Sequence, residues 1–337
     1  MNKKGIGIAG NMIVDITYPI DKWPAQGELV TINEGIVRSS GGAVNVLSDL
    51  AKIDPSLRLS MYGAIGNDSE GDFLTEELGA YKNVSLDGVR RMGRTSFTAV
   101  MSNAAAGMRT FFQYRGANAL FDESFIDWSS MNIDILHISY ALLLDALDEE
   151  DGEYGTKMAR LLAHAQKRGI ETSIDVVSES GDRFKRVFAP SLKYADYCII
   201  NEIEAQNTTG VALRGEDGSF YAKNAKRALE RMKEMGVARW AVIHCPEGGF
   251  GIDENGGYAE LESLKLPKGY IKGTVGAGDA YLSGVLYGAY TGADIGEAMR
   301  LGTAAAAASL GSCGASEGMK SREKLVTLYD DIKEGRI

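Results

Sequence analysis

The sequence has few of the residues that disulfide frameworks and zinc sites need. Its 337 residues include only three cysteines, Cys198, Cys245 and Cys313, and three histidines. The cysteines are odd in number and far apart, so their spacing predicts neither a set of disulfides nor a zinc site. No apolar run is long enough to span a bilayer, and no small-residue cleavage site follows Lys3 and Lys4. These absences favour a cytoplasmic protein.

Positive charge is also in deficit. The chain has 36 Lys and Arg residues against 46 Asp and Glu residues, which gives a net charge of −10. This surplus of acid argues against nucleic acid or an anionic membrane as a partner. The 45% hydrophobic and 24% charged content is ordinary for a globular protein. The length suits one large domain over residues 1–337, with room for a small accessory part.

A run of small residues before an acid is the feature on which the rest of the sequence analysis depends. Gly276, Ala277 and Gly278 directly precede Asp279, and an apolar stretch with helical spacing follows over residues 282–289. A turn that opens a helix presents free N–H groups to an anion. Asp279 at its rim is placed to accept a proton from a hydroxyl, which suits phosphoryl transfer. The alternative from these residues alone is an ordinary helix start with a first-turn acid.

A second glycine pattern lies at the N-terminus. Residues 5–10 match G-x-G-x-x-G, but only four residues precede them and the chain continues as an extended segment. A dinucleotide site needs a strand before the glycines and a helix after them, so we reject it, and an NAD-dependent oxidoreductase has no other support. We expect one first strand that ends at Asp15. An acid there can hold a ligand hydroxyl, with a turn or capping role as the alternative.

Three β-prone segments predict a small sheet apart from the main body. Residues 27–38 alternate in part and are expected to form one or two short strands. Residues 95–102 and 110–114 are expected to form a hairpin around the turn at 103–107.

Polar and glycine residues beside these segments are candidates for ligand contacts. Gly41 and Gly42 stand before a predicted helix that carries Asn45, so the backbone can approach a ligand and Asn45 can bind its hydroxyls. A structural turn is the alternative. Arg115 follows the hairpin and is suited to pair with a substrate carboxylate or phosphate, unless it is a solvated charge.

From residue 133 on, strand patterns alternate with helix patterns. Strands are predicted over residues 133–139, 170–177, 195–200 and 238–244, with a helix over 152–168. Such alternation is typical of a parallel sheet with helices on both faces. His137 is expected at the end of the first of these strands.

Asn201 and Glu204 follow one of these strands at the start of a helix. Polar groups three residues apart share a face of a helix, and such a pair can hold Mg²⁺ through water. A helix cap by Asn201 is the alternative.

In their order along the chain, four stretches resemble motifs of the ribokinase-like (PfkB) carbohydrate kinases. Residues 41–45 resemble G-G-x-x-N, residues 63–71 G-x-x-G-x-D-x-x-G, residues 201–204 N-x-x-E and residues 273–279 D-T-x-G-A-G-D. The resemblance covers nearly the whole chain. It implies an α/β fold with a central, mostly parallel sheet flanked by helices. It also implies a small β-sheet lid, from about residues 15–38 and 92–118, that closes over the sugar and is a possible homodimer surface.

The resemblance also implies an ATP- and Mg²⁺-dependent kinase that acts on a hydroxyl of a small sugar. Catalysis is assigned to the base Asp279 with Gly276, Ala277 and Gly278. Sugar binding is assigned to Asp15, Gly41, Gly42, Asn45 and Arg115. ATP binding is assigned to Asn201, Thr274, Gly249, Gly251, Cys313 and Gly314, and magnesium binding to Asn201 and Glu204. Arg115 tilts the acceptor towards fructose or a keto-deoxy sugar acid, with ribose and nucleosides as alternatives.

Two positions depart from the family pattern. Gly273 replaces an Asp that helps relatives to bind a monovalent cation, which puts potassium activation in doubt. Pro246 replaces the first glycine of a turn near ATP. These departures keep open a catalytically weak sugar-binding or regulatory relative, although Asp279 and its small residues argue for an active enzyme.

Overall fold

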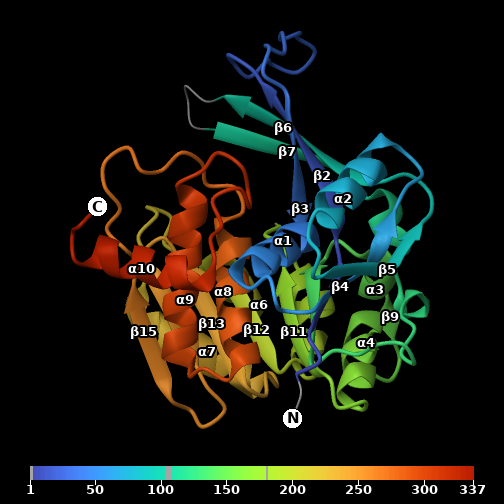
Figure 1. Cartoon of the computed structure of the whole chain (residues 1–337), viewed down its shortest axis with the longest axis vertical. Coiled ribbons are helices and arrows are strands. Elements are labelled where there is room, and N and C mark those ends of the chain that lie inside the picture. The colour runs from blue at the N-terminus through green and yellow to red at the C-terminus, as the bar shows by residue number, and fades with distance from the viewer. Residues whose placement is uncertain (1–2, 104–107, 180) are drawn as a thin grey trace.

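The protein folds around a large sheet in the body and a small sheet that projects from it (Figure 1). This computed structural model describes residues 3–103, 108–179 and 181–337. The nine-stranded large sheet has the order β15 (Tyr258–Glu262), β14 (Gly248–Ile252), β13 (Trp240–Cys245), β12 (Tyr197–Asn201), β11 (Glu171–Val176), β8 (Ile135–Ala141), β1 (Ile6–Gly10), β4 (Leu59–Ile65) and β5 (Val84–Arg91). Strands β13 to β5 pair in parallel, whereas β14 and β15 pair antiparallel at one edge. The predicted mostly parallel central sheet is confirmed.

Helices cover both faces of this sheet, and a hydrophobic core lies on each face. One core contains side chains of α1 (Ala43–Ile53), α2 (Ser69–Gly79), α8 (Ala277–Thr291), α9 (Ile295–Leu310) and α10 (Arg322–Lys333). The other contains side chains of α3 (Asp145–Asp148), α4 (Lys157–Gln166), α5 (Ala189–Leu192), α6 (Glu202–Thr209) and α7 (Ala222–Glu234). Neighbouring strand residues alternate between the cores, as Ile199 and Ile200 do. This double burial explains why β1 and most of β12 and β13 are apolar. In the described part of the chain, no helix combines the length and apolarity that a membrane crossing requires.

The small sheet has four strands. They are β3 (Val37–Gly42), β2 (Met12–Pro19), β6 (Ser96–Asn103) and β7 (Met108–Tyr114), in that order. The predicted hairpin is present as β6 and β7, while residues 104–107 of its predicted turn lie outside the described residues. The edge strand β7 is exposed along its length, with Phe111 63% and Phe112 57% exposed. Exposed apolar side chains on a sheet edge support the expected dimer surface, which stays a prediction.

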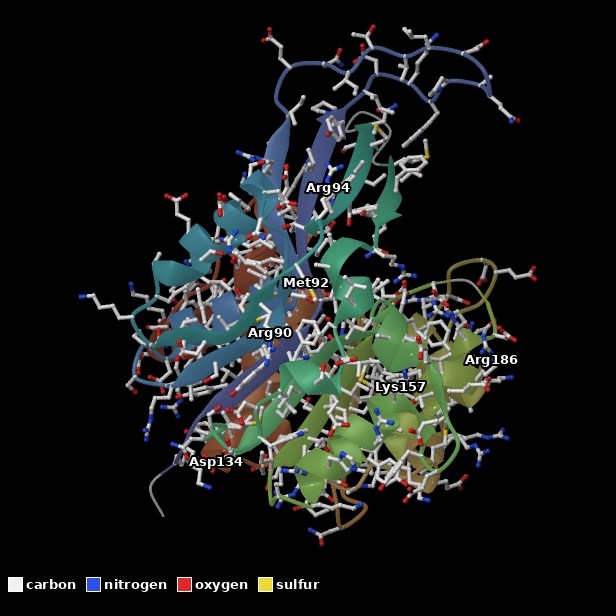
Figure 2. The ribbon with its side chains drawn as sticks, turned by 90° about the vertical axis from the view of Figure 1, so that its right-hand side faces the viewer. Arg90, Met92, Arg94, Asp134, Lys157 and Arg186 are labelled. Carbon is white, nitrogen blue, oxygen red and sulfur yellow. The ribbon has the colours of Figure 1, made fainter. Side chains whose placement is uncertain are left out.

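The loop between β4 and α2 fastens the small sheet to the body. Asp68 accepts a hydrogen bond from the N–H of Gly71 at 2.9 Å and so caps α2, and its second oxygen accepts the N–H of Thr95 at 2.8 Å. Thr95 directly precedes β6. Figure 2 shows from the side the chain segment that leads to Thr95, which rises from Arg90 in β5 past Met92 to Arg94 in the direction of the small sheet.

The prediction of strands over residues 27–38 is wrong, since the first strand of this region begins only at Val37. Gly27 and Gly35 have φ angles of 86° and 92°, which interrupt an extended chain. Leu29 is 87% exposed, so the alternation of residue types here does not correspond to a buried face.

The expected single strand up to Asp15 is also wrong. The chain forms β1 and β2 in different sheets, and Asn11 separates them. Gly10 has a φ of 112°, and a Cβ there would lie 2.3 Å from the carbonyl oxygen of Ser139. Only glycine allows this change of direction. Asp15 therefore lies in the middle of β2, within the small sheet, and not at the end of a strand.

Two smaller predictions also need correction. The helix expected over residues 152–168 starts at Lys157, because the residues before it form a short ribbon, β9 (Glu150–Asp151) with β10 (Gly155–Thr156), and Thr156 caps the helix. His137 is not at a strand end but lies inside β8, fully buried, with Nδ1 2.9 Å from the hydroxyl of Ser173.

Asp49 on α1 is a buried acid whose carboxylate makes no hydrogen bond, in the part of the chain that the structure describes, that would stabilise the fold. Asp49 is fully buried, and neither of its carboxylate oxygens has a hydrogen-bond partner among the described residues. Burial raises the pKa of Asp49 well above its usual range, and the nearby charge of Asp279 raises it further. A buried carboxyl without partners is a cost to stability that grows when the group ionises.

We therefore expect Asp49→Asn to become more stable relative to the wild type as pH rises. Because the folded pKa exceeds the unfolded one, this carboxyl destabilises the wild type above the unfolded pKa and not below it. The difference in the free energy of unfolding should grow by roughly 1–3 kcal/mol between pH 4 and pH 8. Urea denaturation at several pH values measures it, with the exposed Glu76→Gln on α2 as control. A difference that does not change with pH would contradict a buried, unpaired Asp49.

Candidate active site

The turn before α8 is built as the sequence predicts. Gly276 stands directly before the helix with a φ of 77°, in the left-handed region that favours glycine. A Cβ there would lie 2.6 Å from the carbonyl oxygen of Ala315, so the turn packs tightly against the loop that follows α9. The first-turn N–H groups, those of Ala277, Gly278 and Asp279, have no carbonyl partner within the helix. With the helix dipole they favour an anion.

Asp279 is held from two distant parts of the chain. It is only 7% exposed. Asn45 Nδ2 donates to one carboxylate oxygen at 2.8 Å, and the hydroxyl of Tyr140 donates to the other. Burial raises the pKa of Asp279, while the hydrogen bonds from Tyr140 and Asn45 and the charge of His137 oppose the rise. A fixed carboxylate with a raised pKa is suited to take a proton from an alcohol.

Asp15 faces the same region from β2. A Cβ on Gly41 would lie 2.9 Å from its carboxylate, so glycine leaves the room that Asp15 occupies. Burial raises the pKa of Asp15 to about 6, the hydrogen bond with Thr98 lowers it, and the charge of Asp279 raises it. The structure thus brings together three of the residues predicted to bind the sugar, Asp15, Gly41 and Asn45, beside the predicted base.

The other two residues predicted to bind the sugar are engaged with the protein. Gly42 has a φ of 60°, and a Cβ there would lie 2.5 Å from the carbonyl oxygen of Asn11. Its glycine therefore lets α1 start close to the junction of β1 and β2. Arg115 Nη1 donates to the carbonyl oxygen of Leu142 at 2.8 Å, and its Nε lies 3.8 Å from Asp145. Arg115 is thus tied to the segment after β8.

A cavity of about 420 Å³ lies beside Asp279. It is lined by the ends of four parallel strands, the start of α8 and the small sheet, through residues that include Tyr140, Asp175, Asn201, His244, Gly278 and Phe111. Thr274, Glu204 and Asp279 line it as well. Ligands of open α/β sheets bind at the carboxyl ends of strands, so this cavity is the natural place for a substrate. It lies between the body and the small sheet.

Asn201 and Glu204 form a capping box at the start of α6. Asn201 Oδ1 accepts the N–H groups of Ile203 and Glu204 at 3.0 and 2.9 Å, and Glu204 Oε2 accepts the N–H of Asn201 at 2.9 Å. The capping alternative is therefore real. Both residues also line the cavity, where Ser178 donates to Glu204 Oε1 at 2.8 Å. Burial raises the pKa of Glu204 to about 8.

The donors around the cavity fit a magnesium ion that keeps most of its water. In residues 3–103, 108–179 and 181–337 no three His, Cys, Asp or Glu side chains lie close enough to enclose a metal. Asp175 Oδ1 is buried with no hydrogen-bond partner in that part of the chain, and it lines the cavity together with Glu204. Mg²⁺ is usually bound through one or two carboxylates and several waters. Asp175 and Glu204 supply that number.

The sequence analysis did not single out Tyr140, Asp175 or His244. Asp175 had a usable signal, because an acid inside a buried apolar strand is costly without a function or a partner. His244 lies in β13, and burial lowers its pKa to about 4, so its ring is neutral. The ring faces Gly278, where an added Cβ would lie 3.3 Å from it. Tyr140 had no local signal, since its contact with Asp279 joins residues 139 positions apart.

The glycines predicted to contact ATP in β14 lie against helices. A Cβ on Gly249 would overlap the hydroxyl of Tyr281 in α8, and one on Gly251 would lie 2.7 Å from the side chain of Ile295 in α9. Helix packing is thus a sufficient reason for both glycines. Their contact with a nucleotide stays a prediction.

The loop after α9 packs on the segment before the anion turn. A Cβ on Gly273 would lie 2.9 Å from the carbonyl oxygen of Ser312 and 3.0 Å from that of Cys313. An aspartate at position 273 would therefore need this loop to move. Cys313 and its neighbour Gly314 lie on the same loop, close to the turn, which is the arrangement that their predicted role requires.

Comparison with known proteins adds a family and a fold. A family model described as pfkB family carbohydrate kinase matches residues 6–322. An uncharacterized sugar kinase of Archaeoglobus fulgidus is 29% identical over 261 residues, which are 76% of this chain and 93% of that protein. The structure resembles an Arabidopsis thaliana ribokinase complexed with ribose and ATP, with a TM-score of 0.78, 20% identity and coverage of 97% and 99% of the two chains. A ribokinase of Thermotoga maritima has a TM-score of 0.77, 22% identity and the same coverage.

Proposed function

The chain belongs to the pfkB family of carbohydrate kinases, and we propose that it transfers the γ-phosphoryl group of ATP to a hydroxyl of a small sugar. Membership makes it a phosphotransferase with an alcohol acceptor. The observation that carries the proposal is Asp279, a buried carboxylate held by Asn45 and Tyr140 at the start of α8. The proposed base and the N–H groups that would bind the anion belong to the first turn of α8. The backbone of this helix therefore fixes the distance between the base and those N–H groups.

Catalysis of the proposed reaction depends mainly on the positioning of the two substrates and on the stabilisation of charge on the transferred phosphoryl group. The sugar hydroxyl attacks the γ-phosphorus of ATP and gives its proton to Asp279, while the bond from that phosphorus to the β-phosphate oxygen breaks and ADP leaves. The N–H groups of residues 276–279 carry the charge that develops on the transferred group. Asp15 and Asn45 lie beside Asp279 and orient the sugar hydroxyls. Closure of the small sheet over the sugar would exclude water.

Magnesium belongs to this proposal as the partner of ATP. Asp175 and Glu204 would hold a hydrated ion in the cavity, and Asn201 positions Glu204 through the capping box. When bound, Mg²⁺ neutralises phosphate charge and aligns the phosphates. The two roles of Asn201 and Glu204, helix cap and metal environment, are compatible because the capping bonds leave Glu204 Oε1 directed at Ser178 and the cavity.

Tyr140 gives a test of the proposed base through pH. Tyr140→Phe removes a hydrogen bond that lowers the pKa of Asp279. The pKa of the base therefore rises, a larger fraction of it is protonated at a given pH, and activity on the acid side should be lost at a higher pH than in the wild type. We expect kcat to fall about tenfold, in the lower range for one hydrogen bond at a reacting group.

The measurement for Tyr140→Phe is the pH profile of kcat/KM between pH 5 and 9. Tyr154→Phe, which changes a tyrosine on the other side of the sheet, is the control. An unchanged acid limb in Tyr140→Phe would mean that Asp279 is not the group that titrates in the reaction.

The acceptor is proposed to be a small sugar of the fructose, keto-deoxy sugar acid or ribose type. Arg183 Nη1 donates to the carbonyl oxygen of Leu142 at 3.1 Å, and Arg115 donates to the same oxygen. Two guanidinium groups therefore lie together at Leu142, two residues after Tyr140 in the sequence. This pair favours an acceptor with a carboxylate. Arg183 pairs with Asp148 at 3.0 Å and with Glu179 at 2.9 Å. Arg115 lies 3.8 Å from Asp145. These carboxylates offset the charge of both guanidinium groups, so neutral sugars belong in the same panel.

ADP release from ATP and Mg²⁺ across pentoses, hexoses, sugar acids, sugar phosphates and nucleosides tests this function. One sugar that raises turnover well above the background establishes the sugar kinase and names its acceptor. A response to nucleosides alone would make the chain a nucleoside kinase. Silence across the panel, while sugars still raise the melting temperature, would instead support a catalytically weak sugar-binding relative.

A further inference from the structure

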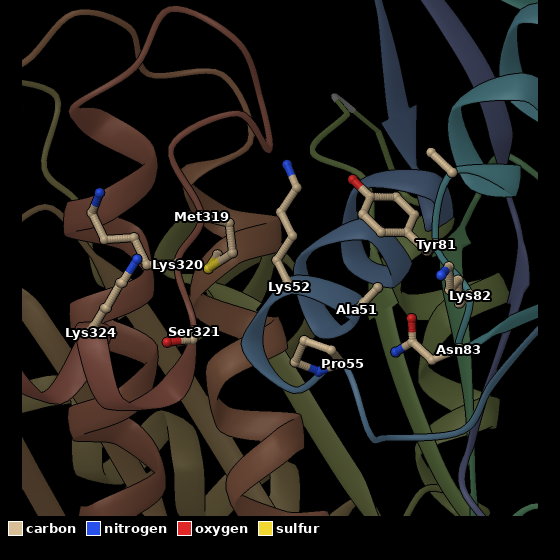
Figure 3. Close-up of a pocket in the computed structure, with 11 residues that line it drawn as sticks. Ala51, Lys52, Pro55, Tyr81, Lys82, Asn83, Met319, Lys320, Ser321 and Lys324 are labelled. Atoms are coloured by element: carbon tan, nitrogen blue, oxygen red, sulfur yellow. The ribbon is translucent and has the colours of Figure 1, made fainter.

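A second cavity lies away from Asp279, between the end of α1, the segment after α2 and the start of α10 (Figure 3). Its volume is about 680 Å³, larger than that of the cavity beside Asp279. The polar side chains around it are those of Lys52, Lys82, Lys320, Lys324, Tyr81, Asn83 and Ser321. No residue assigned to catalysis, sugar or nucleotide lines it. It is therefore a separate feature of the surface.

Four lysines in one cavity are unexpected in a protein with a net charge of −10. Within the described part of the chain none of the four takes part in an ion pair. In Figure 3 Lys52 rises between Tyr81 on one side and Lys320 and Lys324 on the other. Like charges gathered in a concave site raise the local concentration of anions, and they repel one another when the site is empty.

Lys52 is fixed in place, whereas the other three ammonium groups extend towards solvent. Its Nζ donates to the carbonyl oxygen of Ser316 at 2.8 Å, so its side chain is already ordered by a neutral acceptor, and the buried Asp49 is close enough to sense its charge. The carboxylate of Glu77, which is close enough to sense Lys52, accepts from the hydroxyl of Ser40 at 2.9 Å and does not line the cavity. A preordered cation lowers the entropic cost of binding an anion.

The start of α10 adds a second source of positive potential. Ser321 precedes the helix and lines the cavity, and its side chain makes no capping hydrogen bond. The first-turn N–H groups and the helix dipole therefore act on the same space as the lysines. The hydroxyl of Tyr81 supplies a further hydrogen-bond donor at the opposite wall. The amide nitrogen of Asn83 already donates to the carbonyl oxygens of Asp54 and Leu57.

We propose that this cavity is a binding site for a small phosphorylated anion, separate from the site of phosphoryl transfer. Several lysines, a helix start and the hydroxyl of Tyr81 suit the oxygens of a phosphate or diphosphate group better than a single carboxylate. The surplus acid of the whole chain repels nucleic acid, so the ligand is a small molecule. The proposal does not depend on the acceptor sugar or on catalysis.

Calorimetric titration of the full chain with pyrophosphate tests the site. The cavity variant carries Lys82→Gln, Lys320→Gln and Lys324→Gln, and the control carries Lys185→Gln, Lys193→Gln and Lys223→Gln, which change the net charge equally. We expect the wild type and the control to bind pyrophosphate with similar affinity at this site and the cavity variant to bind it at least about tenfold more weakly. Equal affinity in the two variants would overturn the proposal.

Site-resolved lysine acetylation keeps the proposal testable if the cavity variant does not fold. In the wild-type protein pyrophosphate should slow acetylation of Lys82, Lys320 and Lys324 relative to the three control lysines, at constant ionic strength set with chloride. Binding at the turn before α8 alone would leave these rates unchanged. Unchanged rates at pyrophosphate concentrations that saturate the calorimetric signal would also overturn the proposal.

Discussion

Asp279→Asn is expected to lower kcat by about 10²–10⁴-fold, the range for loss of a general base. The amide has nearly the shape of the carboxylate, but it cannot take a proton from the sugar hydroxyl. The site should otherwise persist. The amide oxygen can still accept from Asn45, and the hydroxyl of Tyr140 can rotate to accept from the amide N–H group. The loss should therefore appear in catalysis and not in folding.

Three measurements on Asp279→Asn separate these effects. Single-turnover kinetics give the rate of phosphoryl transfer, thermal unfolding gives the stability, and titration with ADP gives nucleotide affinity. The exposed Asp217→Asn, which removes the same charge elsewhere, should behave as the wild type. A variant that keeps more than about a tenth of the wild-type rate would show that Asp279 is not the base. A variant that no longer folds would assign Asp279 a structural role.

The turn and helix around Asp279 were predictable because their determinants are local. Small residues mark the turn, the acid marks the first turn of the helix, and apolar spacing marks its buried face. The helix runs from Ala277 to Thr291 and ends at Gly292, whose φ of 83° is the left-handed conformation expected of a C-terminal glycine. Each of these features involves neighbours in the sequence.

Contacts made across the fold were not predictable from the sequence, even where a known motif contained one of the residues. The resemblance to a family motif predicted a sugar-binding role for Asn45, but not its hydrogen bond to Asp279, which lies 234 positions away. Tyr140 makes an equivalent contact, but no motif contains it, so nothing in the sequence pointed to it. Asp175 lies between these cases, since its place in a buried strand marks it as unusual but not as part of this site.

Strand pairing explains the errors in the small sheet. Residues 27–38 have a stronger alternating pattern than residues 37–42, yet the latter form the strand because they pair with β2 from Thr17 to Met12. Local β-propensity does not indicate which segment will find a partner. Asp15 illustrates the consequence, because it was expected at the end of the first strand but lies within β2, and its sugar-binding role stays a prediction.

Gly276→Ala is expected to lower kcat about 10²-fold, through displacement of the N–H groups that hold the phosphoryl group. At a φ of 77° an alanine costs about 1–2 kcal/mol of backbone strain. Its Cβ would also lie 2.6 Å from the carbonyl oxygen and 2.8 Å from the Cα of Ala315, so either the turn or the neighbouring loop must move. Such a displacement of groups at the reacting centre lowers the rate of catalysis strongly.

Gly292→Ala at the other end of α8 is the matched control. Its φ of 83° imposes a similar strain, but nothing lies within 4 Å of the added Cβ. Gly292→Ala should therefore lose stability in urea through strain alone, and Gly276→Ala should lose at least as much, while only Gly276→Ala loses phosphoryl transfer and affinity for ATP. Equal losses of activity in the two variants would trace the effect to strain in the helix. Near wild-type kcat in Gly276→Ala would mean that the turn before α8 does not bind the transferred group, because a displaced set of N–H groups cannot stabilise it equally well.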